Sequence, residues 1–387
     1  MTWDRRPFPE VIDFLEGPGI MARDFRDSGV PLVRLAGLTG GDLLAGCNFL
    51  DEDAVARRWS HFRLREGDVL LSTSATLGRV ARTTAEAEGA IPYTGIIRMR
   101  PAVSDVDAHF IKFLLKGPDF QRQVEAMGAG SVMNHFGPTH LRKMTVLLPP
   151  LAVQLAVVQT LSALDDKIEC NQRLAQTADT LWRTELAAVV ADAVDTQPLS
   201  ALAQFVNGKN FTKDASGTGR PVIRIAEMSK GVTAGTVRND VSAVPDNICR
   251  SGDLLFAWSG SLQAMRWFAK EGLVNQHIFK VVSAPGVPIW LLHGYLDMLM
   301  PFYKGIAADK ATTMGHIKRE HLNEPVPLLP STTIAELDAT CGPLWSRALA
   351  AERESLVLAE LRDALLPKLL SGEVRVEEAE EQVEEAV

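Results

Sequence analysis

The sequence of this chain repeats itself. Its longest match, a Met-x-His-x4-His-Leu pattern closed by Leu-Leu-Pro, occupies residues 133–149 and returns 181 residues later at residues 314–330. Two shorter matches precede it, at residues 31–36 and 221–226 and at residues 67–72 and 252–257. Their offsets are 190 and 185 residues, so the spacing shrinks in small steps, as loop insertions in two copies of one domain would make it. The repeat therefore predicts a tandem duplication, with a helical stretch after each copy.

The chain is long enough and apolar enough to fold as more than one domain. Its 387 residues allow two or three domains, and a hydrophobic content of 46% supplies two cores. The first residues lack the pattern of a signal peptide, and no apolar run approaches the roughly 18 residues that would span a bilayer. The four cysteines are widely spaced without a Cys-x-x-Cys pair, which favours neither a zinc site nor a disulfide framework. We therefore expect a cytoplasmic protein with no membrane partner.

The charge is acidic overall but unevenly distributed. The net charge is −8, of which residues 373–387, with seven Glu and one Arg, contribute −6. The rest of the chain therefore carries only −2, the difference between these values, and contains no basic run. A DNA-binding function would require positive charge to be concentrated by folding or supplied by partner subunits. The acidic tail itself is typical of a solvated, frayed terminus.

Two stretches of the chain have the spacing of a coiled-coil seam. Positions that alternate by four and three residues are apolar at eight of ten places from 157 to 189, and again at eight of ten from 337 to 369. Small residues in both seams would allow a close approach of the helices: Ala175, Ala178, Ala348 and Ala351.

Pairing of the two stretches with each other is the economical way to bury both seams. An antiparallel pair would set the two globular halves at its opposite ends, and roughly 40 residues at about 1.5 Å each make a spacer of about 60 Å. Pro343 is expected to break or kink the second helix, and Pro367 to do the same one turn before Gly372. The alternative is that each helix simply caps its own domain.

Each globular half mixes strands and short helices. Apolar runs after Gly-Asp turns predict strands at 69–72 and 254–257, each leading into a loop of small residues. Further elements are expected at matching places: strands at 96–99 and 278–281, and helices at 110–125 and 289–300. The predicted fold class is therefore α+β, with two tandem domains separated by an antiparallel pair of long helices that form a coiled coil.

Motifs of known catalytic chemistry are absent from the sequence. It has no phosphate-binding loop, dinucleotide fingerprint or His-Glu-x-x-His pattern. The stretch Leu148-Pro149-Pro150-Leu151 lacks the polar and aromatic residues of an amino-methyltransferase motif and suits a Pro-Pro pair before a helix. Asp165 and Asp166 fall between two seam residues, where we expect a solvated helix face and not a nuclease site. The sequence therefore predicts no catalytic residue.

Two histidine pairs also repeat. His135 and His140 are matched by His316 and His321. A spacing of five residues does not place two side chains on one helical face, and no carboxylate cluster repeats around them. We therefore expect these histidines to cap or pack the junction before each long helix, with metal binding as the alternative.

Two segments carry a resemblance to a known family. Leu-Ser-Ala-Leu-Asp-Asp-Lys-Ile-Glu-Cys-Asn at 161–171 follows a Pro-Pro-Leu-x-x-Gln stretch at 149–154. It closely resembles the first conserved region of the specificity subunits of type I restriction-modification systems. Residues 359–374 look like the end of their second conserved region. One departure is that Ala335 and Glu336 stand where a Gln would be expected, which bears only on local capping.

The resemblance implies a subunit that recognises DNA and performs no chemistry itself. Residues 1–150 and 198–330 would be target recognition domains, each reading one half of a split DNA sequence. Residues 151–197 and 331–372 would be helical spacers that fix the gap, and 373–387 an acidic tail.

Similar proteins bind double-stranded DNA and work in the cytoplasm of bacteria or archaea. They dock two methyltransferase subunits, which use S-adenosylmethionine to methylate adenine, and two translocase-nuclease subunits, which use ATP and Mg. By this resemblance the chain itself would bind no cofactor or metal.

Candidate DNA contacts are polar loop residues, because Arg, Lys, Asn and Gln read base edges while Lys, Arg, Ser and Thr hold phosphates. In the first half these are Ser74, Thr76, Arg79, Arg82, Ser131 and Asn134. In the second half they are Lys209, Asn210, Lys213, Ser259, Ser261, Lys310, Thr312 and Thr313. For each of them, a plain solvated surface residue is the alternative.

Leucines outside the seams are candidate contacts for the methyltransferase subunits. They are Leu174, Leu181, Leu186, Leu349, Leu356 and Leu361. The alternative is that some of them belong to a broad seam inside the helix pair. For the whole chain, the alternative function is a scaffold that spaces two protein partners without reading DNA.

Overall fold

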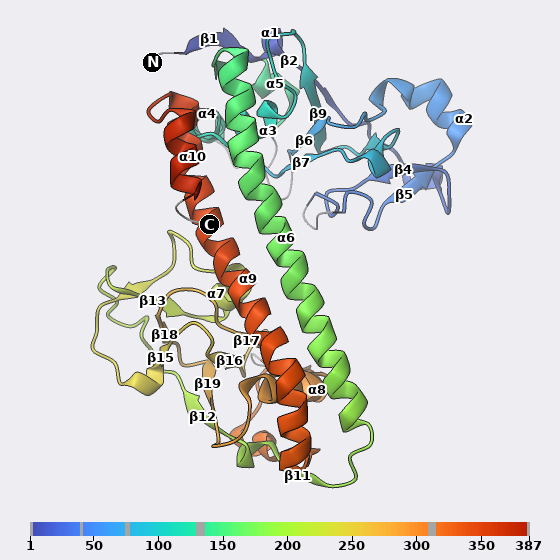
Figure 1. Cartoon of the computed structure of the whole chain (residues 1–387). Coiled ribbons are helices and arrows are strands. Elements are labelled where there is room, and N and C mark those ends of the chain that lie inside the picture. The colour runs from blue at the N-terminus through green and yellow to red at the C-terminus, as the bar shows by residue number, and fades with distance from the viewer. Residues whose placement is uncertain (1–2, 39–41, 74–77, 129–135, 309–314, 385–387) are drawn as a thin grey trace. The chain divides into compact units, whose positions relative to one another are not determined.

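The computed structural model describes residues 3–38, 42–73, 78–128, 136–308 and 315–384 (Figure 1). The chain divides into two compact units: unit 1 comprises residues 1–166 and 359–387, and unit 2 comprises residues 167–358. Two long helices, α6 (Leu151–Val190) and α9 (Ser331–Ser371), each contribute to both units. No helix in the described ranges is long and apolar enough to cross a membrane.

Unit 1 contains two four-stranded sheets. The first has the strand order β2-β9-β6-β7 and is antiparallel throughout, and the second has the order β3-β5-β4-β8 with β4 and β8 parallel. The strands of the first sheet are β2 (Ile12–Glu16), β6 (Val69–Ser72), β7 (Val80–Arg82) and β9 (Ile96–Pro101). Those of the second are β3 (Phe25–Arg26), β4 (Val30–Val33), β5 (Asn48–Leu50) and β8 (Ile91–Pro92). Strand β1 (Asp4–Pro7) pairs with β10 (Thr145–Leu148) immediately before α6.

Unit 2 repeats this plan with its own strands. Its sheets have the orders β12-β19-β16-β17 and β14-β13-β18-β15, and β13 and β18 are parallel like β4 and β8. The strands of the first sheet are β12 (Ala203–Asn207), β16 (Leu254–Ala257), β17 (Gln263–Arg266) and β19 (Ile278–Ser283). Those of the second are β13 (Arg220–Ile223), β14 (Arg238–Asn239), β15 (Ile248–Cys249) and β18 (Gly272–Val274). Strand β11 (Thr196–Pro198) pairs with β20 (Pro325–Pro327) just before α9. The duplication predicted from the sequence is therefore a duplication of architecture.

The strands predicted from apolar runs are confirmed. Every residue of β6 and of β16 is buried, because each strand has a neighbour on both sides and is covered on both faces. The first predicted helix instead forms two helices, α3 (Phe110–Lys116) and α4 (Pro118–Gly128), since Pro118 cannot donate the hydrogen bond that would continue α3. Its counterpart α8 (Ile289–Ala308) continues beyond the expected end, through Pro301. The other helices are α1 (Phe8–Val11), α2 (Glu52–Ala54), α5 (Pro138–Leu141), α7 (Ile225–Lys230) and α10 (Val376–Glu384).

The two long helices pack against each other along the predicted seams, and the expected fold class is confirmed (Figure 1). In unit 2, the alanines at 175, 178, 348 and 351 form one buried cluster. The pairing is antiparallel, because Asn171 Nδ2 donates to Glu354 Oε2 at 2.9 Å while the Cys341 thiol lies 3.8 Å from the carbonyl oxygen of Trp182. In unit 1, buried seam residues come from the start of α6 and the end of α9: Val157, Leu161, Leu164, Leu365 and Leu369.

Two expectations about the end of the chain are wrong. Helix α9 is continuous through Pro343 and Pro367. Cys341 and Trp345, beside the first proline, are buried in the core of unit 2. This packing outweighs the roughly 3 kcal/mol cost of a proline inside a helix. The helix ends at Gly372, as predicted, with φ +72°. Beyond it, α10 is a helix with a fully buried Ala379, so residues 376–384 are not a frayed tail.

Candidate functional site

The backbone at the carboxyl end of β6 in unit 1 has the same hydrogen-bonding arrangement as the backbone at the carboxyl end of β16 in unit 2. In unit 1, Thr73 N–H donates to the Gly95 carbonyl at 2.9 Å, and Gly17 N–H donates to the Ile96 carbonyl at 2.9 Å. In unit 2, the matching bonds run from Trp258 to His277 at 3.2 Å and from Gly208 to Ile278 at 3.0 Å. We call these places strand-end site 1 (Glu16, Gly17, Thr73 and Gly95) and strand-end site 2 (Asn207, Gly208, Trp258 and His277).

A close approach of two backbone segments explains the glycine in each strand-end site. A Cβ atom on Gly17 would lie 2.2 Å from the Pro92 carbonyl oxygen, and one on Gly208 would lie 2.1 Å from the Asn275 carbonyl oxygen. Real Cβ atoms do not come this close to backbone, so only glycine fits. Glu16 and Asn207, which precede these glycines, therefore occupy matching positions in unit 1 and unit 2.

The side chains of the two sites differ although their backbones match. In site 1, Glu16 is partly buried and its Oε1 accepts from Gly95 N–H at 3.3 Å. In site 2, Asn207 is exposed and its Oδ1 accepts from Trp258 Nε1 at 3.2 Å. The Trp258 ring also packs against His277, with ring centroids 5.5 Å apart. One scaffold thus presents a carboxylate in unit 1 and a carboxamide beside two rings in unit 2.

Several predicted DNA contacts lie at or beside these sites. Arg79 N–H donates to Ser72 Oγ at 2.9 Å, directly before Thr73 of site 1. Lys209 follows Gly208 and is exposed, as are Lys213 and Ser261. Asn210 is exposed too, but its Oδ1 accepts from Thr212 Oγ1 at 2.7 Å and from Lys213 N–H at 3.3 Å, which organises the turn after site 2.

Two of the predicted contacts lie away from the accessible part of the strand-end sites. Ser259 is only 4% exposed, because its backbone pairs with His316 and its neighbour Gly260 donates to the Gly315 carbonyl at 2.8 Å. Arg82 pairs with Val69 at the start of β6, about 10 Å along the strand from site 1, and its guanidinium donates to His109 Nδ1 at 2.6 Å. Seven other candidates lie outside the described residues: Ser74, Thr76, Ser131, Asn134, Lys310, Thr312 and Thr313.

Two of the repeated histidines, His140 and His321, cap the junctions before the long helices, as expected. His140 Nδ1 accepts from Gly137 N–H at 3.1 Å, and His321 Nδ1 accepts from Lys318 N–H at 3.1 Å. His135 lies outside the described residues. Within the described ranges, no group of three or more His, Cys, Asp or Glu side chains is arranged to hold a metal ion.

Asp165 does not lie on a solvated helix face, contrary to our expectation. Its side chain is 16% exposed and accepts from Lys112 Nζ at 2.6 Å and from Arg362 at 2.7 Å. Burial alone would raise the pKa of this carboxyl, but the bonds from Lys112 and Arg362 hold the pKa below its usual value. In unit 1 Asp165 therefore joins α3, α6 and α9, which is a structural role.

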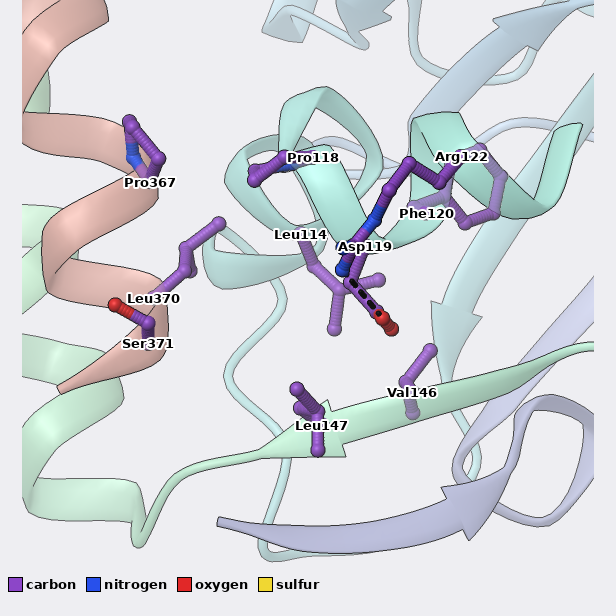
Figure 2. A pocket seen from close by; sticks show the side chains of 11 residues that line it. Leu114, Pro118, Asp119, Phe120, Arg122, Val146, Leu147, Pro367, Leu370 and Ser371 are labelled. Carbon is purple, nitrogen blue, oxygen red and sulfur yellow. Dashed lines mark hydrogen bonds and ion pairs between the residues drawn. The ribbon is translucent and has the colours of Figure 1, made fainter. Parts of the chain in front are cut away.

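An apolar hollow with a volume of about 90 Å³ lies in unit 1 beside α4, β10 and the end of α9 (Figure 2). Its one carboxylate, Asp119, is engaged by Arg5 at 3.0 Å and by Arg122 at 3.3 Å. The Ser371 hydroxyl donates to the Lys368 carbonyl at 3.1 Å. These pairings leave a lining of aliphatic side chains, which offers packing and not acid–base chemistry.

The leucines proposed as partner contacts differ in accessibility. Leu181 is 49% exposed on α6, which suits a docking surface. Leu186 is 2% exposed and lies under Gly294 of α8, so it belongs to the core of unit 2 and not to a partner surface. The remaining four are partly buried: Leu174, Leu349, Leu356 and Leu361.

Sequence reasoning missed most of the strand-end residues. Glu16, Asn207, Trp258 and His277 were not among the candidates, because three strands far apart in sequence bring them together. One signal was available: Gly17 and Gly208 are 191 residues apart, which extends the series of offsets 190, 185 and 181. A repeated glycine within such a series indicates a shared backbone requirement.

Comparisons with known proteins agree with the architecture. The family model for the type I restriction modification DNA specificity domain matches residues 10–178. The chain is 22% identical over 357 residues to the type I restriction enzyme MjaIX specificity subunit of Methanocaldococcus jannaschii, covering 81% of this chain and 79% of that protein. It is 24% identical over 200 residues to the type I restriction enzyme EcoKI specificity subunit of Escherichia coli, covering 44% of this chain and 41% of that protein.

A solved structure shares the fold. The S subunit of a type I restriction-modification system from M. genitalium matches with a TM-score of 0.61 at 13% identity, covering 95% of this chain and 96% of that one. The family match over residues 10–178 and the curated relatives indicate that this chain is similar to type I restriction-modification specificity subunits, and the solved structure shows that it shares their fold.

Proposed function

We propose that this chain reads a DNA target made of two separated halves, with strand-end site 1 reading one half and strand-end site 2 the other. The observation that supports it is the pair of matched backbones with different side chains at Glu16 and Asn207. A protein that reads two unlike half-sites can use the same backbone framework in both domains, but it needs different base-contacting side chains in each. A scaffold for protein partners alone would not need this difference.

Cations beside the sites support contact with the DNA backbone. Lys209 and Lys213 are exposed next to site 2, and Arg79 is held next to site 1. Lys and Arg hold phosphates without reading sequence, so these residues would position the duplex. The acidic net charge of −8 favours the rival scaffold function, but residues 373–387 account for −6 of it.

We also propose that the paired helices α6 and α9 set the gap between the half-sites and dock the enzymatic subunits. A 40-residue helix is about 60 Å long. Leu181 and Val357 are each 49% exposed on the part of the helix pair within unit 2, where an apolar helix could cover them. The partners would be two methyltransferase subunits that use S-adenosylmethionine and two restriction subunits that use ATP and Mg, while this chain holds none of these cofactors and performs no chemistry.

The test of this function is co-expression with the methyltransferase subunits, followed by genome-wide mapping of methylated adenines. One split motif is expected. Replacement of residues 1–150 with those of a relative should change one half of the motif, and replacement of residues 198–330 should change the other. A stable complex that methylates no adenine, or a motif that does not split, would favour the rival scaffold.

The docking surface has its own test. Leu181→Lys places a charge on the exposed helix face and should weaken methyltransferase assembly at least tenfold in a pull-down titration. Val194→Lys is the control, because Val194 is 93% exposed beyond the end of α6. Unchanged assembly of the Leu181→Lys protein, with the fold intact by circular dichroism, would remove this surface from the proposal.

A further inference from the structure

The two strand-end sites present opposite hydrogen-bonding polarity at the same place. Glu16 is the last residue of β2 and stands opposite Ile97, and Asn207 is the last residue of β12 and stands opposite Phe279. Gly17 and Gly208 follow them, at the close approach of two backbone segments. The two side chains are therefore structural equivalents.

In site 2, the neighbouring tryptophan decides which way the Asn207 amide points. An indole N–H can only donate, so the amide atom 3.2 Å from Trp258 Nε1 must be the oxygen. The amide nitrogen of Asn207 then remains as a donor, and no described residue bonds it. Site 2 thus offers a fixed donor on an exposed side chain.

In site 1, Glu16 can only accept. Its Oε1 takes the Gly95 N–H bond, and no described residue bonds its Oε2. A carboxylate is repelled by phosphates, and the hydrogen-bond donors that a duplex presents in its grooves are base amino groups: N4 of cytosine, N6 of adenine and N2 of guanine. Only such an amino group would make a carboxylate favourable at a DNA surface.

We propose that Glu16 reads a base amino group in one half-site, and that Asn207, oriented by Trp258, reads a base acceptor such as guanine N7 or O6 at the corresponding position of the other. This assignment rests on the proposed function and adds which kind of hydrogen-bonding group reads each half-site. The two halves of the target differ in polarity at one matched position. Trp258 is a positioning residue, because it acts through Asn207.

The experiment uses the complex of the full chain with its methyltransferase subunits and duplexes that carry base analogues within the mapped target. Analogues without the exocyclic amino group, purine for adenine and 2-pyrimidinone for cytosine, are placed one at a time in the first half-site. At one position the wild-type complex should bind roughly 5- to 150-fold more weakly, the range expected for a base contact. Glu16→Ala should bind both duplexes equally, while Glu10→Ala, an exposed glutamate in α1 before β2, should behave like the wild type.

The second half-site is probed with 7-deazapurines, which lack the N7 acceptor, and with 2-aminopurine in place of guanine, which lacks O6. The wild-type complex should lose affinity at one position, and Asn207→Ala should lose that sensitivity. Trp258→Phe removes the orienting N–H, so the amide can turn, and the base preference should relax at this same position without a uniform loss of affinity.

Three outcomes would overturn the proposal. If Glu16→Ala remains as sensitive to every amino-group deletion as the wild type, the carboxylate does not read a base. If Glu16→Ala or Asn207→Ala weakens all duplexes equally, the residue has only a structural role. In both cases a split methylation motif would leave the proposed function standing, whereas a wild-type complex without any split motif would overturn the proposed function together with this assignment.

Discussion

Arg266 and Asp179 form a bidentate ion pair in unit 2, with Arg266 Nη1 and Nη2 lying 2.6 and 3.0 Å from the two carboxylate oxygens. The same guanidinium donates to both oxygens of Glu352, at 2.6 and 2.9 Å. Its side chain is 3% exposed. One arginine on β17 therefore ties the sheet of unit 2 to both long helices, since Asp179 belongs to α6 and Glu352 to α9.

Removal of this arginine should destabilise the chain strongly. Arg266→Met keeps the length of the side chain but removes the ion-pair partner of Glu352 and leaves Asp179 with Arg183 alone, and loss of one partner from a buried ion pair costs about 3–5 kcal/mol. Urea unfolding measures the change. Arg250→Met is the control, because the Arg250–Glu271 pair is exposed and should contribute less than about 1 kcal/mol. Equal effects of the two substitutions would contradict the role assigned to Arg266.

The stability of unit 2 should fall as the pH is lowered from about 6.5 to about 4. Burial, with smaller contributions from Arg183 and Arg266, lowers the pKa of His293 from 6.5 to about 4 against the opposing effect of Asp297. In this window the unfolded chain binds a proton that the folded chain does not, so the folded state loses up to about 3 kcal/mol relative to its stability at neutral pH.

The variant His293→Leu checks this assignment by urea unfolding at several pH values. Its stability should change less between pH 6.5 and 4 than that of the wild type, because leucine has no proton to gain. His61→Leu, at an exposed position of unit 1, should keep the wild-type slope. A His293→Leu protein with an unchanged slope would assign the pH dependence to other groups.

The alanine cluster between the long helices should not tolerate larger side chains. Ala351 is fully buried, so Ala351→Leu forces the two helices apart and should cost about 1–3 kcal/mol by overpacking. Ala350→Leu, one residue earlier on an exposed face of α9, should change the stability by less than about 0.5 kcal/mol. Thermal unfolding of the two variants provides the comparison, and similar melting temperatures would show that the seam is loosely packed.

The glycine of strand-end site 1 should be essential for one half of the target only. Gly17→Ala would place a Cβ 2.2 Å from the Pro92 carbonyl oxygen, so β2 must shift and move Glu16. We expect discrimination between base pairs to weaken at least tenfold at the first half-site. Discrimination at the second half-site should not change. Gly19→Ala is the control, because a Cβ there meets no atom within 4 Å. Methylation of duplexes altered in one half-site at a time measures both effects.

Lys209 should contribute affinity but no sequence preference. A lysine bound to a phosphate releases about one counterion. Lys209→Ala should therefore make the plot of the logarithm of affinity against the logarithm of salt concentration less steep by about 0.9, and it should weaken the binding of all duplexes alike. Lys304→Ala, an exposed lysine on α8, should leave the slope unchanged. A loss confined to one base pair would instead identify Lys209 as a base-reading residue.

The large elements could be predicted because their signals are local. The seams of α6 and α9 repeat every three or four residues, and the buried strands β6 and β16 are short apolar runs after a Gly-Asp turn. The junction histidines His140 and His321 were expected to cap, and each bonds a backbone N–H three residues earlier. In these cases the predictive pattern itself lies within a few turns of helix or a single strand.

The site could be predicted only in part, because its residues meet across long intervals of sequence. Loop chemistry selected Lys209 and Arg79, which lie beside the strand-end sites, but it also selected Ser259, which is buried, and Arg82, which pairs with the far end of β6. Burial and strand direction depend on neighbours in the sheet, which loop composition does not report.

The amino-acid order thus encodes the duplication, the helix seams and the polar loops, since each is a periodic or local property of the chain. The equivalence of Glu16 and Asn207 arises only when β2 meets β9 and β12 meets β19, where the paired positions Glu16–Ile97 and Asn207–Phe279 are 81 and 72 residues apart. The continuity of α9 through Pro343 likewise depends on the core that surrounds Cys341 and Trp345. Packing energy, summed over many distant contacts, overrules the local preference of a single residue.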